Sequence, residues 1–159
     1  MSSAPLLPAD AFLAVVRHAP LVAVDLIIEN DRREVLLGLR NNRPARHYWF
    51  VPGGRIRKNE TIRAALERVS RDELAIGAPP GDARLIGAYD HRYDDNYAGV
   101  AGVGTHYVVL AFRLTLPDLD LGELPLSQHR AYRWFPVATL LEAADVHPHV
   151  KAYFASGRK

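Results

Sequence analysis

Residues 48–77 read YWFVPGGRIRKNETIRAALERVSRDELAIG, which is a strand pattern, a glycine turn and an amphipathic helix in that order. Apolar residues in the helical part recur at spacings that predict one buried helix face. They are Ile62, Ala65, Leu66, Val69 and Ile76. Glu73 falls inside this stripe, and because an ionised carboxylate is costly to bury alone, a cationic group is expected to meet it. The alternative is a frayed helix end that leaves Glu73 in solvent.

The glycine turn at residues 52–54 comes just before this helix. Glycines allow backbone conformations that other residues avoid, and they expose carbonyl and amide groups near the helix start, where phosphates and metal ions bind. A glycine turn alone is a weak signal, but here three side chains follow it at fixed offsets. Five residues separate Gly54 from Glu60, seven separate Glu60 from Arg68, and Glu73 stands five positions after Arg68.

This spacing resembles the Nudix box, in which Gly is followed after five residues by Glu, and after seven more by Arg-Glu-aliphatic-x-Glu-Glu-x-Gly-aliphatic. Three positions depart from that pattern. Val69 stands where the family usually has the first Glu after Arg, Asp72 replaces the first of the paired Glu, and Ala75 replaces Gly. Nudix pyrophosphatases use the extra carboxylates to hold metal for attack at phosphorus, so the departures argue against that chemistry here.

Length and composition indicate one ordinary globular domain over all 159 residues, with residues 1–8 forming a loose N-terminal segment. The formal charge of +2 is too balanced to favour a nucleic-acid partner. The sequence contains no cysteine, which excludes disulfides, thiol catalysis and thiolate metal sites. It also shows neither a membrane-spanning apolar run nor a signal sequence, which predicts a cytoplasmic protein without a membrane partner.

Strand and helix patterns alternate along the rest of the chain. Helices are predicted at residues 11–17, with Asp10 as the cap, and at 137–144 and 147–156. Strands are predicted at residues 22–28, 34–40, 48–51, 83–91, 106–114 and 132–135. Loop 93–104 is a candidate lid or binding loop because it is rich in glycine and acids. Strands on both sides of a central helix, with closing helices, predict an α/β/α sandwich around a mixed sheet.

Five further segments extend the resemblance over nearly the whole chain. They are residues 42–45 (NRPA), 48–55 (YWFVPGGR), 93–97 (YDDNY), 105–110 (THYVVL) and 128–134 (QHRAYRW). In this order they resemble one Nudix branch, the GDP-mannose mannosyl hydrolases, which also carries an apolar residue after the box Arg and one metal-binding Glu before Leu. One difference is that Glu73-Leu-Ala-Ile-Gly places glycine later than the usual Glu-Leu-Gly of the branch.

The resemblance implies the Nudix fold, a homodimer, and hydrolysis of GDP-mannose, and to some extent GDP-glucose, to GDP and free sugar. Water attacks the anomeric carbon with inversion in this branch. Such cleavage needs a base for the water and a cation on the departing diphosphate, so one Mg²⁺ per active site is sufficient. Two alternatives stay open: a Nudix pyrophosphatase that cleaves the phosphoanhydride, and a domain that binds a nucleotide sugar without turnover.

The resemblance also implies a metal site and a general base. Mg²⁺ would be held by the Gly53 carbonyl, the Glu73 carboxylate and the Gln128 side chain, with diphosphate oxygens and water completing an octahedron. His129 is the expected general base, because an imidazole with a pKa near about 6.5 accepts a proton at neutral pH. Taken without the resemblance, Gln128 and His129 would read as ordinary loop residues.

Arginines and a tyrosine are expected around the leaving group. The matching arginines of this branch face the nucleotide diphosphate or organise the box, and they correspond to Arg40, Arg55 and Arg68. Negative charge grows on the diphosphate as the bond breaks, so arginines there would help most in the transition state. Arg68 has an alternative role in an ion pair with Glu60. Tyr107 is expected either to donate a hydrogen bond to the leaving phosphate or to pack into the core.

Two more residues are expected at the substrate. Asp25 interrupts an apolar strand, which predicts burial near the sugar or near a cation. His91, beside the acidic loop, is expected to touch the sugar or the metal-bound water. Asp72 is read as solvated, with a second metal ligand as the alternative. The histidines without such context are read as structural, and they are His18, His47, His147 and His149.

Overall fold

The protein is a mixed β-sheet between two helical layers in the computed structural model, which describes residues 6–77 and 83–155. The strands are β1 (Leu21–Glu29), β2 (Glu34–Arg40), β3 (Trp49–Phe50), β4 (Gly53–Arg55), β5 (Arg84–Tyr93), β6 (Thr105–Thr115) and β7 (His129–Pro136). The helices are α1 (Ala9–His18), α2 (Ile62–Leu74), α3 (Val137–Glu142) and α4 (Pro148–Ala152), with a 3₁₀ turn at Leu121–Glu123.

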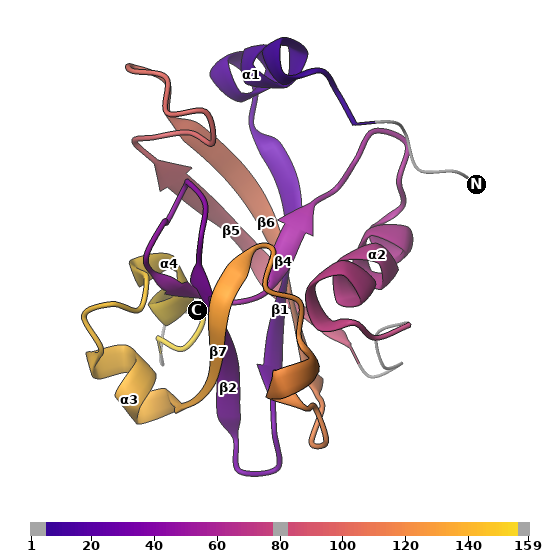
Figure 1. The fold of residues 1–159 in the computed structure, drawn as a ribbon, viewed down its shortest axis with the longest axis vertical. Helices are drawn as coiled ribbons and strands as arrows, with labels where there is room; N and C mark the ends of the chain where they lie inside the picture. The colour runs from indigo at the N-terminus through magenta and orange to yellow at the C-terminus, as the bar shows by residue number, and fades with distance from the viewer. Residues whose placement is uncertain (1–5, 78–82, 156–159) are drawn as a thin grey trace.

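The sheet has the strand order β3-β2-β1-β6-β5, with β4 paired to β1 and β7 paired to β2. Strands β1 and β6 run parallel along their whole length, whereas the other pairs are antiparallel. Figure 1 shows α2 on one side of the sheet and α3 and α4 on the other. The predicted sandwich around a mixed sheet is therefore confirmed.

Strand β1 forms the centre of both cores, because alternate side chains of a strand point to opposite faces. Val24, Leu26 and Ile28 are fully buried in the cluster that includes the inner face of α2. Ile27 is buried on the other face, in a cluster that includes Val150 of α4.

None of the helices in residues 6–77 and 83–155 has the length and apolar character of a membrane span.

Helix α2 follows its predicted stripe in the middle but not at its ends. Thr61 caps it by accepting a hydrogen bond from the Ala64 amide at 3.1 Å, and Ala75 ends it in the left-handed conformation. Ile76 therefore lies beyond the helix, although it still packs against the same core. Ile62, by contrast, is 47% exposed, so its predicted burial is wrong. Residue spacing assigns a helix face, but it does not show where the helix starts to overlap the sheet.

Three further expectations are corrected by the structure. Asp10 does not cap α1, because the helix already begins at Ala9 with Pro8 at the cap position. Helix α4 ends at Ala152, and residue 156 of its predicted range lies outside the described residues, as do residues 1–5 of the N-terminal segment. Strand β7 begins at His129 instead of residue 132, because that segment pairs with β2. His129 is thus a strand residue and not a loop residue.

Candidate active site

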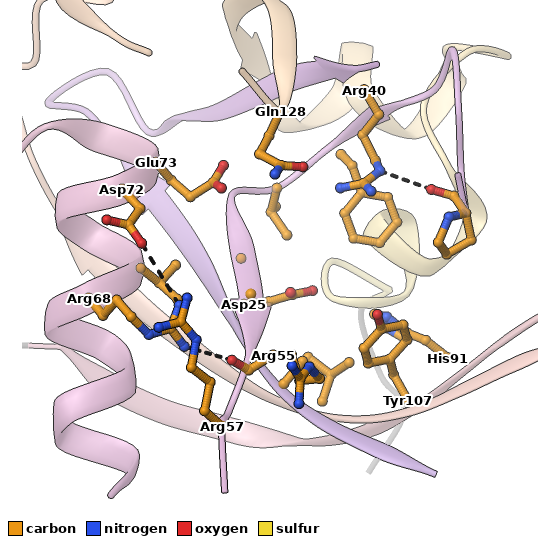
Figure 2. A pocket seen from close by; sticks show the side chains of 18 of the residues that line it. Asp25, Arg40, Arg55, Arg57, Arg68, Asp72, Glu73, His91, Tyr107 and Gln128 are labelled. Atoms are coloured by element: carbon orange, nitrogen blue, oxygen red, sulfur yellow. Dashed lines mark hydrogen bonds and ion pairs between the residues drawn. The ribbon is translucent and has the colours of Figure 1, made fainter. Parts of the chain in front are cut away.

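A cavity of about 680 Å³ opens between the glycine turn, α2 and the strands β1 and β6. Figure 2 shows the side chains that converge on it from these elements. All of the predicted site residues except His129 line this cavity, and they are Asp25, Arg40, Gly53, Arg55, Arg68, Glu73, His91, Tyr107 and Gln128. The fold therefore brings together residues as far apart in the sequence as Asp25 and Gln128.

The glycine turn occupies a space that no side chain could share. Strand β4 pairs antiparallel with β1 so that Gly53 lies opposite Asp25 and Gly54 opposite Val24. A Cβ on Gly53 would collide with the Asp25 carboxyl group and would lie 2.7 Å from the Val24 carbonyl oxygen. A Cβ on Gly54 would lie 2.9 Å from Cγ2 of Val69. The two glycines thus let the turn fit between β1 and α2.

Arg68 is held by the ion pair that the sequence offered as its alternative role. Its guanidinium donates to the two carboxylate oxygens of Glu60 at 2.7 and 2.9 Å, and to the Arg55 carbonyl at 2.7 Å. The hydrogen bonds between the two side chains raise the pKa of Arg68 and lower the pKa of Glu60. Asp72 lies 3.9 Å from Arg68 and its side chain is 51% exposed, in agreement with its expected solvation.

Glu73 and Gln128 reach into the cavity from opposite walls and point toward each other in Figure 2. Glu73 is 8% exposed, which confirms its predicted burial, and its Oε2 accepts no hydrogen bond from the described residues. This carboxylate oxygen lies 3.3 Å from Nδ1 of His129, and with the Gln128 amide and the Gly53 backbone of the same cavity it forms a hard-oxygen donor set that suits Mg²⁺. The residues present therefore fit a magnesium site.

His129 lies behind Glu73 instead of facing the cavity. Its ring is 1% exposed and packs against Gly38, where a Cβ would lie only 2.5 Å from the ring carbons. Nδ1 is 3.3 Å from the Glu73 carboxylate and 3.3 Å from the Tyr132 hydroxyl, and Nε2 has no described partner. The imidazole is thus the group that meets the buried carboxylate. The general-base role stays a prediction, since in this position the ring does not reach the cavity.

Asp25 lies against the glycine turn, and its carboxyl group points away from Glu73 in Figure 2. Its carboxyl group is 6% exposed and accepts a hydrogen bond of 2.5 Å from the Tyr153 hydroxyl. Burial raises the pKa of Asp25 to about 7, although the hydrogen bond from Tyr153 and the charge of Arg40 act in the lowering direction. The Tyr153 hydroxyl also lies 3.3 Å from Nε2 of His91. Sequence reasoning missed Tyr153, because no motif links it to a residue 128 positions earlier.

The remaining predicted residues form further walls of the cavity. Arg40 donates from Nε to the Pro44 carbonyl at 2.9 Å, which directs its guanidinium along the cavity. The Arg55 guanidinium lies 4.6 Å from the ring centre of Phe12 in α1, and burial lowers its pKa. Tyr107 is half-buried against α1, lines the cavity, and has its pKa raised by burial. Its packing in the core agrees with one of its two expected roles, and the hydrogen bond to a leaving phosphate stays a prediction.

The candidate lid contributes little to this cavity. Tyr93, at the end of β5, is the residue of the 93–104 segment that lines it. The Tyr97 hydroxyl donates to the Ala9 carbonyl at 2.7 Å and fastens the loop to α1. Tyr97 and Gly99 instead line a neighbouring groove of about 710 Å³, which also includes Arg40 and Gln128.

The protein has a mixed sheet between helices, and the glycine turn, helix α2 and a cluster of arginines surround one cavity. These features define a hydrolase with the Nudix fold. Comparison with known families agrees, since the NUDIX domain model matches residues 19–155. The chain belongs to the Nudix family.

Two named proteins are similar in sequence to this chain. The chain is 40% identical over 148 residues to the low-salt glycan biosynthesis protein Agl8 of Haloferax volcanii, covering 92% of this chain and 88% of that protein. It is 39% identical over 113 residues to an ADP-ribose pyrophosphatase of Methanocaldococcus jannaschii, covering 67% of this chain and 65% of that protein.

Two solved structures share the fold. The MutT protein of Methanosarcina mazei Go1 has a TM-score of 0.65 and 22% identity, over 86% of this chain and 91% of that chain. The NUDIX domain of Shewanella oneidensis NrtR, complexed with ADP ribose, has a TM-score of 0.63 and 19% identity, over 92% of this chain and 94% of that chain.

The histidines around α4 make the stability of the fold sensitive to acid. Burial, reinforced by neighbouring histidines, lowers the pKa of His91 to about 3 and of His147 to about 4. The unfolded chain binds these protons near pH 6.5, so it gains protons before the folded chain does. The stabilisation is therefore complete above about pH 6.5 and is lost as the pH falls toward the folded-state values.

We expect His147→Asn to weaken this pH dependence. His147 caps α4 by accepting a hydrogen bond from the His149 amide, and Asn can serve as the cap without titrating. Urea unfolding of both proteins at several values between pH 7 and pH 4 measures the effect. The variant should lose less unfolding free energy than the wild type over this range. Equal losses in the two proteins would contradict the assignment of His147.

Proposed function

We propose that this protein hydrolyses GDP-mannose, and to some extent GDP-glucose, to GDP and the free sugar in a Mg²⁺-dependent reaction. Water attacks the anomeric carbon with inversion. The proposal rests on how few carboxylates helix α2 places at the cavity. Glu73 is its one buried carboxylate, Val69 packs against Gly54 where a second carboxylate would stand, and Asp72 is half-exposed beside Arg68.

One carboxylate suits a reaction in which the metal assists the leaving group. The Gly53 carbonyl, Glu73 and Gln128 would hold a single Mg²⁺, which would offset the negative charge that grows on the departing diphosphate. Attack at phosphorus in ordinary Nudix enzymes relies on further carboxylates, whereas the other cavity-lining carboxylate of this helix, Asp72, is half-exposed and lies 3.9 Å from Arg68. Cleavage at a sugar carbon needs fewer carboxylate ligands, because one metal ion on the leaving group is sufficient. The single buried carboxylate of α2 therefore supports this reaction.

The other residues of the cavity divide into two groups. Arg40 and Arg55 supply positive charge where the diphosphate would lie, and Tyr107 supplies a hydroxyl donor between them. Asp25 and His91 form the end where the sugar would lie, since a carboxylate there stabilises positive charge that develops on the ring. Arg68 acts through its ion pair with Glu60, which fixes the turn against α2 in the geometry that the site needs.

The named activities of the relatives bear on this choice. A glycan biosynthesis protein is in keeping with a nucleotide sugar as substrate. The ADP-ribose pyrophosphatase favours the rival in which the phosphoanhydride is cleaved instead. A domain that binds a nucleotide sugar without turnover is the third candidate, but the retention of Glu73, Gln128 and His129 argues against it. We also propose that the protein is a homodimer, and analytical ultracentrifugation tests this by measuring the mass of the species in solution.

Product identification separates these candidates. We expect incubation of GDP-mannose with the protein and Mg²⁺ to yield GDP and mannose, resolved by ion-exchange chromatography and a reducing-sugar assay. A panel of GDP-sugars run in parallel ranks the substrates. Formation of GMP and mannose 1-phosphate would replace our proposal with the pyrophosphatase, and binding of GDP-mannose without any product would favour the third candidate.

His129 provides a test of the general base. For it to accept a proton from water, the segment that leads into β7 must bring the imidazole from behind Glu73 to the cavity. We expect His129→Gln to lower kcat by about 10²–10⁴-fold while GDP affinity changes little. Because the ring is buried and packs against Gly38, a lower melting temperature is expected as well. Kinetics at several Mg²⁺ concentrations complete the test. Wild-type turnover would refute the base role, and recovery of kcat at high Mg²⁺ would show that His129 serves to hold Glu73.

A further inference from the structure

The carboxyl group of Asp25 is held from behind by a residue that does not line the cavity. Figure 2 shows this group pointing toward the side of the cavity formed by Arg40, His91 and Tyr107. Its Oδ2 accepts the hydrogen bond from Tyr153, and its Oδ1 lies against Gly53, where a Cβ would collide with it. With one oxygen bonded and the other confined by the glycine turn, the carboxyl group has one available orientation.

Tyr153 meets Asp25 on the α4 face of the sheet, the face to which Ile27 of β1 also points. It follows directly after α4, is 7% exposed, and packs edge-on against Tyr89 with ring centres 4.8 Å apart. Burial and the neighbouring carboxylate raise the pKa of Tyr153, so its hydroxyl stays protonated and remains a donor. Its ring is part of the α4 core, but its hydroxyl is the only part of that core bonded to Asp25 among the described contacts.

The contact with His91 extends this arrangement by one residue. A tyrosine hydroxyl carries one proton, and Tyr153 donates it to Asp25. The hydroxyl oxygen can then accept a hydrogen bond from Nε2 of His91, which lies 3.3 Å away. The ring of His91 is in turn stacked on His149 at 4.3 Å with an interplanar angle of 3°. A chain of donors therefore runs from His91 through Tyr153 to the carboxylate.

We propose that Tyr153 is a positioning residue of the active site, which fixes the Asp25 carboxylate in the orientation that the sugar end of the substrate meets. The inference rests on the proposed function, in which Asp25 faces the sugar. Tyr153 does not touch the substrate, since it is not among the residues that line the cavity. Its hydroxyl acts through Asp25, whereas its ring serves the packing of α4.

A double-mutant cycle on Tyr153 and Asp25 tests this inference. Tyr153→Phe removes the hydroxyl and keeps the ring contacts, and Asp25→Asn removes the charged acceptor. We expect Tyr153→Phe to lower kcat about tenfold to a hundredfold, the range for a hydrogen bond to a charged group, with KM within about twofold of wild type. In the Asp25→Asn protein, whose amide oxygen is a weaker, neutral acceptor, the same change should lower kcat clearly less than in the wild type.

Tyr89→Phe is the matched control, because it removes a hydroxyl from the ring that packs against Tyr153 and lies outside the cavity lining. Its kcat should equal that of the wild type. Equal losses of kcat on Tyr153→Phe in both backgrounds, or no loss in the wild-type background, would overturn the inference. A lower melting temperature without loss of kcat would leave Tyr153 with a packing role alone and would also overturn it.

A second measurement covers the case in which Tyr153→Phe does not fold. The Tyr153 hydroxyl proton should give a strongly deshielded, slowly exchanging proton NMR resonance in the wild type, and this resonance should move upfield in Asp25→Asn. An unchanged resonance would refute the contact. The cycle is run on whichever nucleotide sugar the wild type hydrolyses fastest. A wild type that releases GMP would refute the proposed function alone, whereas a cycle without coupling would refute the role of Tyr153 alone.

Discussion

The pairing of β4 with β1 is the constraint on which the rest of the site depends. It places Gly53 opposite Asp25 in a space where any Cβ would collide with the carboxyl group. The next residue, Gly54, brings the same turn within contact distance of Val69 on α2. Gly53 and Gly54, which have no side chains, thus allow close packing between β1 and α2. The candidate metal ligands and the buried carboxylate of Asp25 are near each other because of this junction.

The cavity consequently brings two chemically different groups of residues together. The Glu73 carboxylate, the Gln128 amide and the Gly53 carbonyl offer oxygen donors that fit a magnesium ion. The Asp25 carboxyl group, which lies against Gly53, is instead held by Tyr153, whose hydroxyl also lies near His91. Arg40 and Arg55 line the same cavity and supply positive charge to it.

The features that could be predicted from the sequence are those set by local spacing. The offset between Glu60 and Arg68 spans the start of one helix, and the predicted ion pair forms there. The buried position of Glu73 also follows from helix periodicity, and it is confirmed. The alternation of strand and helix patterns was sufficient to predict the α/β/α sandwich, because each element buries one apolar face.

The features that could not be predicted depend on contacts between distant segments. Tyr153 meets Asp25 only because α4 folds back onto the sheet, and no pattern in either segment signals this contact. His129 is buried because β7 begins at that residue and pairs opposite Arg40, a register that the local sequence does not determine. The family resemblance suggested a base at this position, but it did not indicate that the ring would lie behind Glu73.

The site of water attack is the central claim, and hydrolysis of GDP-mannose in water enriched in ¹⁸O tests it most directly. Mass spectrometry of both products shows which one acquires the label. Attack at the sugar carbon predicts one labelled oxygen in mannose and none in GDP. Label in a phosphate group, with no labelled oxygen in the sugar, would contradict the mechanism, and labelled GMP or mannose 1-phosphate would assign the protein to the phosphoanhydride-cleaving members of its family.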